Sequence, residues 1–185
     1  MNSFIEQARF YGTYHQKPIT CYTHLVGVPL VVFSLMVLLG FIHLVIPGVL
    51  DITLAGIATL ILLLYYYYLN WRLALVLTGV FIILLWFAHL VSYYGPTSTA
   101  LWIFIVTFVL GWAIQLIGHL MEGNRPAFTD NLWQALIAPM FLTAEVFFLS
   151  GRMQDLKAQI HGEAELSGPL EPQEATEESD TDTQL

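Results

Sequence analysis

Four side chains of the kinds that bind divalent metals lie in two distant parts of the sequence. His15 and His24 lie near the N-terminus, and His119 and Glu122 follow much later in the chain. His119 and Glu122 are spaced i, i+3, which places them on one face of a helix. Imidazoles and a carboxylate suit iron or zinc, and an incomplete ligand set leaves positions for substrate. These four residues fit a metal site as well as they fit interfacial hydrogen-bonding residues.

One further carboxylate is a candidate because of its surroundings. Glu145 lies in an apolar stretch, where an ionisable side chain is costly and usually marks a functional site. His43 and His89 end other apolar segments, so we interpret them as hydrogen-bonding residues, and His161 lies in a polar region. Because the chain has few carboxylates, a single metal ion is favoured over a pair.

Several catalytic motifs are absent from the sequence. It contains no HExxH, which disfavours a zincin-type protease, and no GxSxG nucleophile elbow. The HxxxH and HxxHH boxes of membrane desaturases and the paired Glu-x-x-His motifs of ferritin-like bundles are also absent. The single cysteine, Cys21, excludes an intramolecular disulfide.

The elements that must position these residues are apolar segments. The chain has 185 residues, of which 57% are apolar and only 6 are Lys or Arg. A helix needs roughly 20 apolar residues to cross a hydrocarbon core of ~30 Å. We expect apolar segments at about Leu25–Ile46, Ile52–Leu69, Leu73–Val91, Thr99–Leu120 and Leu132–Leu149, the last interrupted by Pro139.

The basic residues indicate on which side of the membrane each segment begins. Arg9 and Lys17 precede the first segment, Arg72 separates the second from the third, and Arg125 follows the fourth. The positive-inside rule then predicts a cytoplasmic N-terminus. His15, His24 and His119 fall on that side, whereas His43 and His89 fall on the other. A fifth segment that re-enters the membrane or lies on its surface keeps all six bases on the cytoplasmic side.

The predicted fold is an all-α integral membrane protein with four transmembrane helices plus a re-entrant or fifth C-terminal apolar helix. Residues 1–152 form the polytopic membrane catalytic domain, and residues 153–185 form a polar acidic tail. Eight of the fourteen acidic residues lie between Glu163 and Asp182, so we expect the tail to be disordered. No basic patch indicates nucleic-acid binding.

Two stretches of the sequence resemble one enzyme family. Tyr14-His15-Gln16, followed by the run His24 to Leu30 (HLVGVPL), is similar to the N-terminal motif of membrane 2-hydroxy fatty acid dioxygenases, first described in fungal phytosphingosine breakdown. The run Gly118 to Ala127 (GHLMEGNRPA) resembles the second motif, followed by the run Ala138 to Phe141 (APMF) and by Glu145. The resemblance covers about residues 4 to 150. Thr20 and Cys21 depart from it, because the family often has Asn between the first two histidines.

The resemblance implies an Fe2+-dependent α-oxidation in which a 2-hydroxy fatty acid and O2 give a fatty acid one carbon shorter. It implies that His15, His24 and His119 bind the metal, that Glu122 and Glu145 occupy the acidic positions, and that the bilayer surrounds the protein. A 2-hydroxy acid can chelate iron through its carboxylate and hydroxyl oxygens, beside a position for O2. Lys17 or Arg125 is a candidate partner of the substrate carboxylate.

Two other function classes remain open at this point. The chain could be a non-catalytic membrane transporter or a scaffold of lipid-handling complexes, with the histidines as proton relays or packing residues. It could also be a zinc-dependent membrane hydrolase, since His and Glu ligands accept either metal. The membrane is either a bacterial inner membrane or the endoplasmic reticulum.

Overall fold

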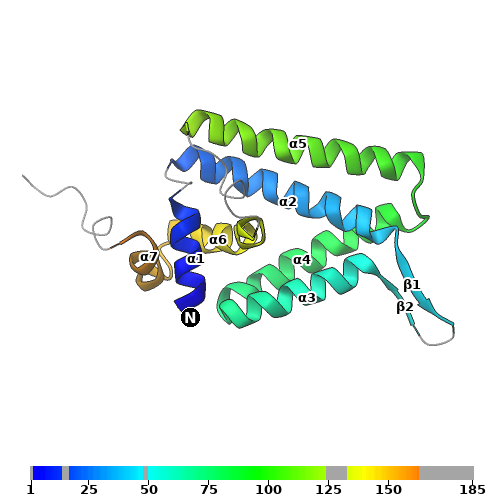
Figure 1. The fold of residues 1–185 in the computed structure, drawn as a ribbon, viewed down its shortest axis with the longest axis horizontal. Helices are drawn as coiled ribbons and strands as arrows, with labels where there is room; N and C mark the ends of the chain where they lie inside the picture. The colour runs from blue at the N-terminus through cyan, green and yellow to red at the C-terminus, as the bar shows by residue number, and fades with distance from the viewer. Residues whose placement is uncertain (1, 14–16, 48–49, 124–132, 163–185) are drawn as a thin grey trace, which may run out of the picture.

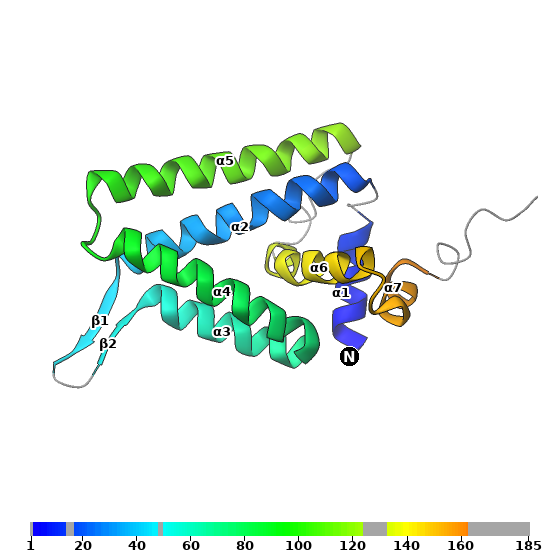
Figure 2. The ribbon, with the colours of Figure 1, turned by 180° about the vertical axis from the view of Figure 1, so that it is seen from behind.

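The computed structural model describes residues 2–13, 17–47, 50–123 and 133–162, and it is mostly helical. Two long antiparallel helices, α2 (Pro18–Gly40) and α5 (Ser98–Glu122), lie side by side. A second pair, α3 (Leu54–Leu69) and α4 (Trp71–Ser92), packs against α2. Figures 1 and 2 show the two pairs meeting at one end of the molecule and diverging toward the other.

Three shorter helices fill the open end between the two pairs. They are α1 (Asn2–Gly12), α6 (Gln134–Leu149) and α7 (Gln154–His161). Figure 1 shows α6 between α2 and the α3–α4 pair, with α1 and α7 beside it. The Tyr66 hydroxyl donates to the Leu136 carbonyl at 2.6 Å and so ties α3 to α6. Tyr66 is fully buried in this contact.

A β-hairpin connects α2 to α3 at the opposite end. Strands β1 (His43–Ile46) and β2 (Leu50–Thr53) pair antiparallel, with His43 opposite Thr53. The expectation that the first apolar segment continues as a helix to Ile46 is therefore wrong, and one short hairpin accompanies the mostly helical fold. Residues 43–46 are Leu, Val and Ile beside a histidine, and β-branched residues favour strands where a pairing partner follows in the sequence.

Local signals explain where the helices begin and end. Pro18 begins α2, a position at which its missing N–H costs nothing. Thr53 and Asn70 accept backbone N–H groups at the starts of α3 and α4, and Thr97 does so for α5. Gly123, with φ 83°, ends α5 in the left-handed conformation.

Three helices are long and apolar enough to cross a membrane, namely α2, α4 and α5, with 23, 22 and 25 residues. The first residues of the segment expected at Ile52–Leu69 belong to β2, so helix α3 has only 16 residues. Helix α6 also has 16. Both fall short of the roughly 20 residues that a span needs, so the count of four spans stays a prediction.

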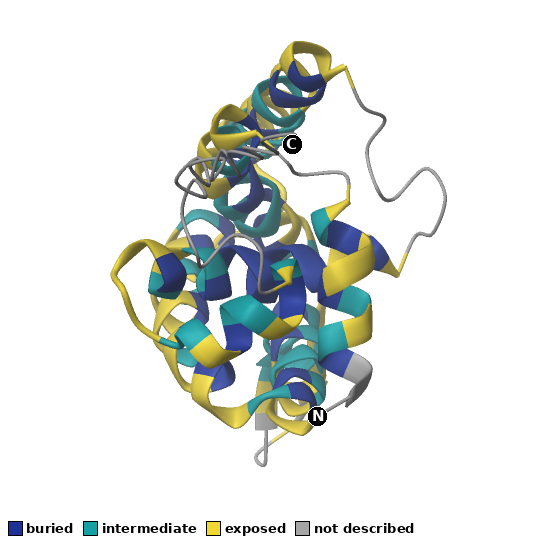
Figure 3. Cartoon of the chain, turned by 90° about the vertical axis from the view of Figure 1, so that its left-hand side faces the viewer, coloured by how far each residue is buried: buried dark blue, intermediate teal, exposed yellow. Residues whose placement is uncertain are grey.

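The surface also has the character of a membrane protein. Large apolar side chains on the outer faces of the helices are exposed, among them Leu60, Ile61, Ile82, Leu90 and Val109. Figure 3 shows the exposed residues on the outward faces and the buried ones turned to the interior. Apolar side chains in such numbers are stable on an outer surface when lipid covers them.

The first part of the segment predicted as a polar tail is helical in the structure. Helix α7 covers Gln154–His161, and Leu156 and Ile160 are buried against the rest of the protein. Their i, i+4 spacing gives a short helix one apolar face, which explains why this stretch packs. The remainder of the predicted tail, from residue 163 onward, lies outside the described residues.

Candidate functional site: two histidines at the end of an apolar cavity

Helices α2 and α5 approach each other closely, because glycines meet where they cross. A Cβ atom added to Gly111 would lie 2.9 Å from the Gly27 carbonyl oxygen, and one added to Gly27 would lie 2.8 Å from that of Gly111. Small residues allow helix backbones in membranes to come this near. The crossing places His24, one turn before Gly27, next to His119 of the antiparallel helix α5.

The His24 and His119 rings meet at right angles. Their centroids lie 4.8 Å apart with an interplanar angle of 87°, and both side chains are buried. His24 Nδ1 lies 2.8 Å from the Thr20 carbonyl oxygen, which can only accept a hydrogen bond. Nδ1 therefore carries the proton, which leaves Nε2 as the acceptor nitrogen of the neutral ring.

Glu122 lies one helical turn beyond His119 and is also buried. Its Oε1 atom accepts the backbone N–H of Lys17 at 3.2 Å. The Lys17 ammonium donates to the carbonyls of Met121 and Glu122, at 3.2 and 3.3 Å, and so caps the C-terminus of α5. These hydrogen bonds hold Lys17, at the start of α2, against the end of α5. Lys17 and Glu122 are both candidate site residues from the sequence.

An apolar cavity of about 270 Å³ begins at the two histidines. Tyr11, Trp112 and Gln115 line it together with His24 and His119, and mostly apolar side chains of α2, α3 and α6 line the remainder. Burial raises the pKa of the Tyr11 hydroxyl above its ordinary value, and the nearby Cys21 thiol adds to the effect. The Tyr11 hydroxyl is therefore protonated at neutral pH.

The structure places Glu145 in a second pocket. Glu145 Oε1 lies 2.7 Å from His161 Nε2 of α7. Arg9, Lys17 and Lys157 line the same polar pocket of about 570 Å³, and the Arg9 side chain bonds the Gln159 carbonyl at 2.5 Å. Neither His24 nor His119 lines this pocket.

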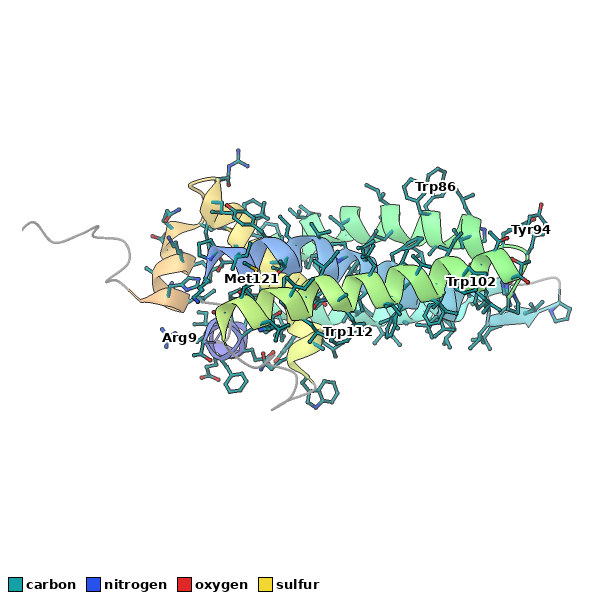
Figure 4. All side chains as sticks on the ribbon, turned by 90° about the horizontal axis from the view of Figure 1, so that it is seen from above. Arg9, Trp86, Tyr94, Trp102, Trp112 and Met121 are labelled. Carbon is teal, nitrogen blue, oxygen red and sulfur yellow. The ribbon has the colours of Figure 1, made fainter. Side chains whose placement is uncertain are left out.

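Other candidates are distributed as follows. His43 lies 3.0 Å from Asp51 in the hairpin, and the His89 ring lies against Tyr93 near the end of α4. Figure 4 shows Tyr94 and Trp102 at the end of the molecule opposite Arg9. His15 and Arg125 lie outside the described residues. Within residues 2–13, 17–47, 50–123 and 133–162, no three His, Cys, Asp or Glu side chains are grouped so that they could hold a metal ion.

Sequence reasoning missed Tyr11 because it did not predict helix α1. The signal was present, since Phe4, Ala8 and Tyr11 recur at i, i+4 and i+7 and all three are buried. Trp112 and Gln115 were also missed. They lie on the same face of α5 as His119, at seven and four residues before it, so helical periodicity from His119 would have found them.

Comparisons with known proteins place these features in a family. Residues 1–150 match the family described as Mpo1-like, 2-hydroxy-palmitic acid dioxygenase Mpo1-like. A relative from Saccharomyces cerevisiae, the 2-hydroxy-palmitic acid dioxygenase MPO1, is 32% identical over 165 residues, which cover 86% of this chain and 88% of the relative. No solved structure matches the chain.

Proposed function

Because this chain belongs to the Mpo1-like family of 2-hydroxy-palmitic acid dioxygenases, we propose that it is an iron(II)-dependent membrane enzyme that shortens 2-hydroxy fatty acids by one carbon. The observation that carries the proposal is the meeting of His24 and His119 at the end of an apolar cavity. A polar head at the histidines and an aliphatic tail in the cavity match the two parts of such a substrate.

His24 and His119 do not by themselves complete a ligand set, so the proposed metal site needs further donors such as Glu122 and His15. His24 presents its Nε2 lone pair because the Thr20 carbonyl holds the proton on Nδ1, the arrangement usual for metal-binding histidines. His119 and the Glu122 carboxylate supply further donors, and His15 precedes Lys17 by two residues in the sequence. When bound, iron(II) supplies Lewis-acid polarisation and reactivity toward O2 that amino-acid side chains lack.

The proposed reaction balances in atoms and electrons. A 2-hydroxy acid and O2 give the acid one carbon shorter, CO2 and water. The C1–C2 bond breaks, C2 becomes the new carboxyl carbon, and the four electrons lost by C1 and C2 reduce O2. The protein binds and orients the substrate so that this bond, and no other, meets the oxidant.

The protein's own groups around the histidines have separate tasks in this proposal. The apolar walls exclude water and bind the acyl chain. The protonated Tyr11 hydroxyl is a hydrogen-bond donor at the cavity. Lys17 remains a candidate for the substrate carboxylate, although in this structure its ammonium bonds two carbonyls of α5. Arg125 is the alternative.

The arrangement of the helices supports a cytoplasmic site. Figure 1 places α1, α7, the start of α2 and the start of α4 at the same end of the molecule. All the described Lys and Arg residues belong to these elements or to the loop before α7, as the positive-inside rule requires of a cytoplasmic face. We propose that the N-terminus is cytoplasmic, in a bacterial inner membrane or the endoplasmic reticulum.

The decisive experiment measures metal and turnover together. The protein is purified, reconstituted anaerobically with Fe2+ or Zn2+, and assayed for O2 consumption with 2-hydroxypalmitate and for the C15 product. We expect iron-dependent O2 uptake and a His119→Ala variant that has lost both bound iron and turnover. The matched control, His89→Ala near the end of α4, retains both.

Two results would overturn the proposal in different ways. Product formation without O2 and with zinc would indicate the hydrolase. Absence of both bound metal and O2 consumption in the wild-type protein would favour a transporter or scaffold. Retention of iron by His119→Ala would exclude His119 as a ligand and leave the rest of the proposal standing.

A further inference from the structure

The cavity at the histidines extends along one face of α2. Its α2 lining runs from His24 through Val28, Val31 and Leu35 to Leu39. At 1.5 Å per residue, the fifteen steps from His24 to Leu39 span ~22 Å. One leaflet of a ~30 Å hydrocarbon core holds acyl chains in about half that thickness, so the cavity is long enough for the tail of a membrane fatty acid.

Small side chains of α3 line the far end of the cavity. Ala55 and Ala58 lie on its wall near Leu39, whereas the larger Leu62 and Tyr66 follow nearer to the histidines. Ala55 is buried, and Ala58 is partly buried. Because α3 begins at the hairpin end, Ala55 is the deeper alanine and Ala58 lies about one turn closer to the histidines.

Hydrogen bonds fix the corner of the backbone that precedes Ala55. The Leu54 N–H donates to the Ile42 carbonyl at 2.8 Å, which ties the start of α3 to the end of α2. The Thr53 hydroxyl accepts the Gly56 N–H at the start of α3, and this bond fixes the same corner. The backbone at this corner cannot move aside for a longer acyl chain without breaking these hydrogen bonds.

We infer that Ala58, with Ala55 and Leu39, sets the chain length of the substrate by forming the floor of the acyl cavity. The inference rests on the proposed function, because it takes the reacting head to lie at His24 and His119. Each methylene that a larger floor residue excludes from the cavity loses its packing there, a loss of up to about fourfold in kcat/KM. Burial of the acyl tail therefore selects the chain length of the substrate, while the head group stays at the two histidines.

The test compares two substitutions to phenylalanine on one helix. Ala58→Phe fills the floor, whereas Ile61→Phe adds an aromatic ring on the outer face of α3, where Ile61 is 63% exposed. kcat/KM is measured for 2-hydroxy acids of 10 to 18 carbons. We expect Ala58→Phe to lower the value for the C16 substrate at least about tenfold and to leave the C10 value nearly unchanged. Ile61→Phe should keep the wild-type profile.

A second variant acts in the opposite direction. Leu39→Ala lengthens the cavity, so the preferred substrate should become longer than in the wild type. Should Ala58→Phe lose activity at every length through misfolding, a lengthened optimum in Leu39→Ala supports the inference, and an unchanged optimum overturns it. An unchanged length profile in a folded, active Ala58→Phe also overturns it.

Binding without O2 separates this inference from the reaction. Binding of saturated fatty acids of the same lengths to the purified variants is measured by competition with a fluorescent fatty acid. The same length shift in binding supports the acyl cavity even if the wild-type protein consumes no O2. Equal binding of all lengths by the wild type and Ala58→Phe contradicts it.

Discussion

Two pockets at the same end of the protein each contain a histidine beside another ionisable side chain, but their walls differ. In the first, His24 meets His119 among aliphatic and aromatic side chains. In the second, His161 meets Glu145 among Arg9, Lys17 and Lys157. A histidine beside a carboxylate and cations makes an ion pair or hydrogen bond, whereas two imidazoles in an apolar wall are the kind of pair that the proposed metal site needs.

The comparison shows why residue type alone does not identify a metal site. The family resemblance groups Glu145 with the motif histidines, and the structure places it with α7. Its surroundings give it a structural task, because the Glu145–His161 contact and the Arg9–Gln159 contact together hold α7 against α1 and α6. Whether Glu145 also binds the metal stays a prediction that the variants below can test.

The largest expected effect distinguishes His24 of the first pocket from His161 of the second. His24→Ala should lower iron content and turnover by at least about 100-fold, because losing a metal ligand costs more than losing the groups that orient one. His161→Ala should stay within about threefold of the wild type. Metal analysis and O2 consumption measure both. Equal losses in the two variants would mean that the pockets act as one site.

The next effect tests the helix crossing that forms the first pocket. In Gly111→Ala, the new Cβ would meet the Gly27 carbonyl at 2.9 Å, so α2 and α5 must separate. Overpacking of this kind costs about 1–3 kcal/mol in free energy of unfolding. Small displacements of reacting groups cost up to about 100-fold in turnover.

The matched control is Gly79→Ala on α4, where no atom lies within 4 Å of the added Cβ. Alanine favours a helix by about 1 kcal/mol over glycine, so this variant should be as stable as the wild type or more so. Thermal unfolding in detergent and the O2 assay compare the two. A Gly111→Ala protein with full activity would argue that the close crossing is not needed.

A smaller effect tests the second pocket. Glu145→Gln removes the charge facing His161 and should cost about 1–2 kcal/mol of α7 docking, the usual range for a hydrogen bond to a charged group. Trypsin should then cut faster after Arg152 and Lys157. Asp155→Asn, an exposed change on the same helix, serves as the control. Loss of iron in Glu145→Gln would instead place this carboxylate with the metal ligands.

The smallest effect concerns one hydrogen bond between α2 and α5. Thr20→Val removes the hydroxyl that donates to the Gly118 carbonyl at 3.3 Å, a long bond worth about 0.5 kcal/mol. Thr107→Val, whose hydroxyl bonds only carbonyls of its own helix, is the control. Comparison of their melting temperatures measures the difference. The backbone carbonyl that holds His24 is unaffected, so iron content should not change.

Much of the fold could be predicted from the sequence because its signals are local. Apolar runs without charge predicted α4 and α5 close to their observed limits, as for Thr99–Leu120 within α5, whereas the run predicted at Leu25–Ile46 begins and ends later than α2. The spacing of His119 and Glu122 predicted their shared helix. The hairpin was missed because its residues are as apolar as those of the helix before it, and hydropathy does not distinguish a strand from a helix.

The sequence by itself determined which residues are candidates for chemistry, because residue type and helical spacing follow from covalent structure. Only the tertiary structure decided which of them meet. The close crossing at Gly27 and Gly111 brings His24 to His119, and the docking of α7 turns Glu145 toward His161. These contacts join residues far apart in the chain, so they depend on the packing of whole helices, which no local pattern contains.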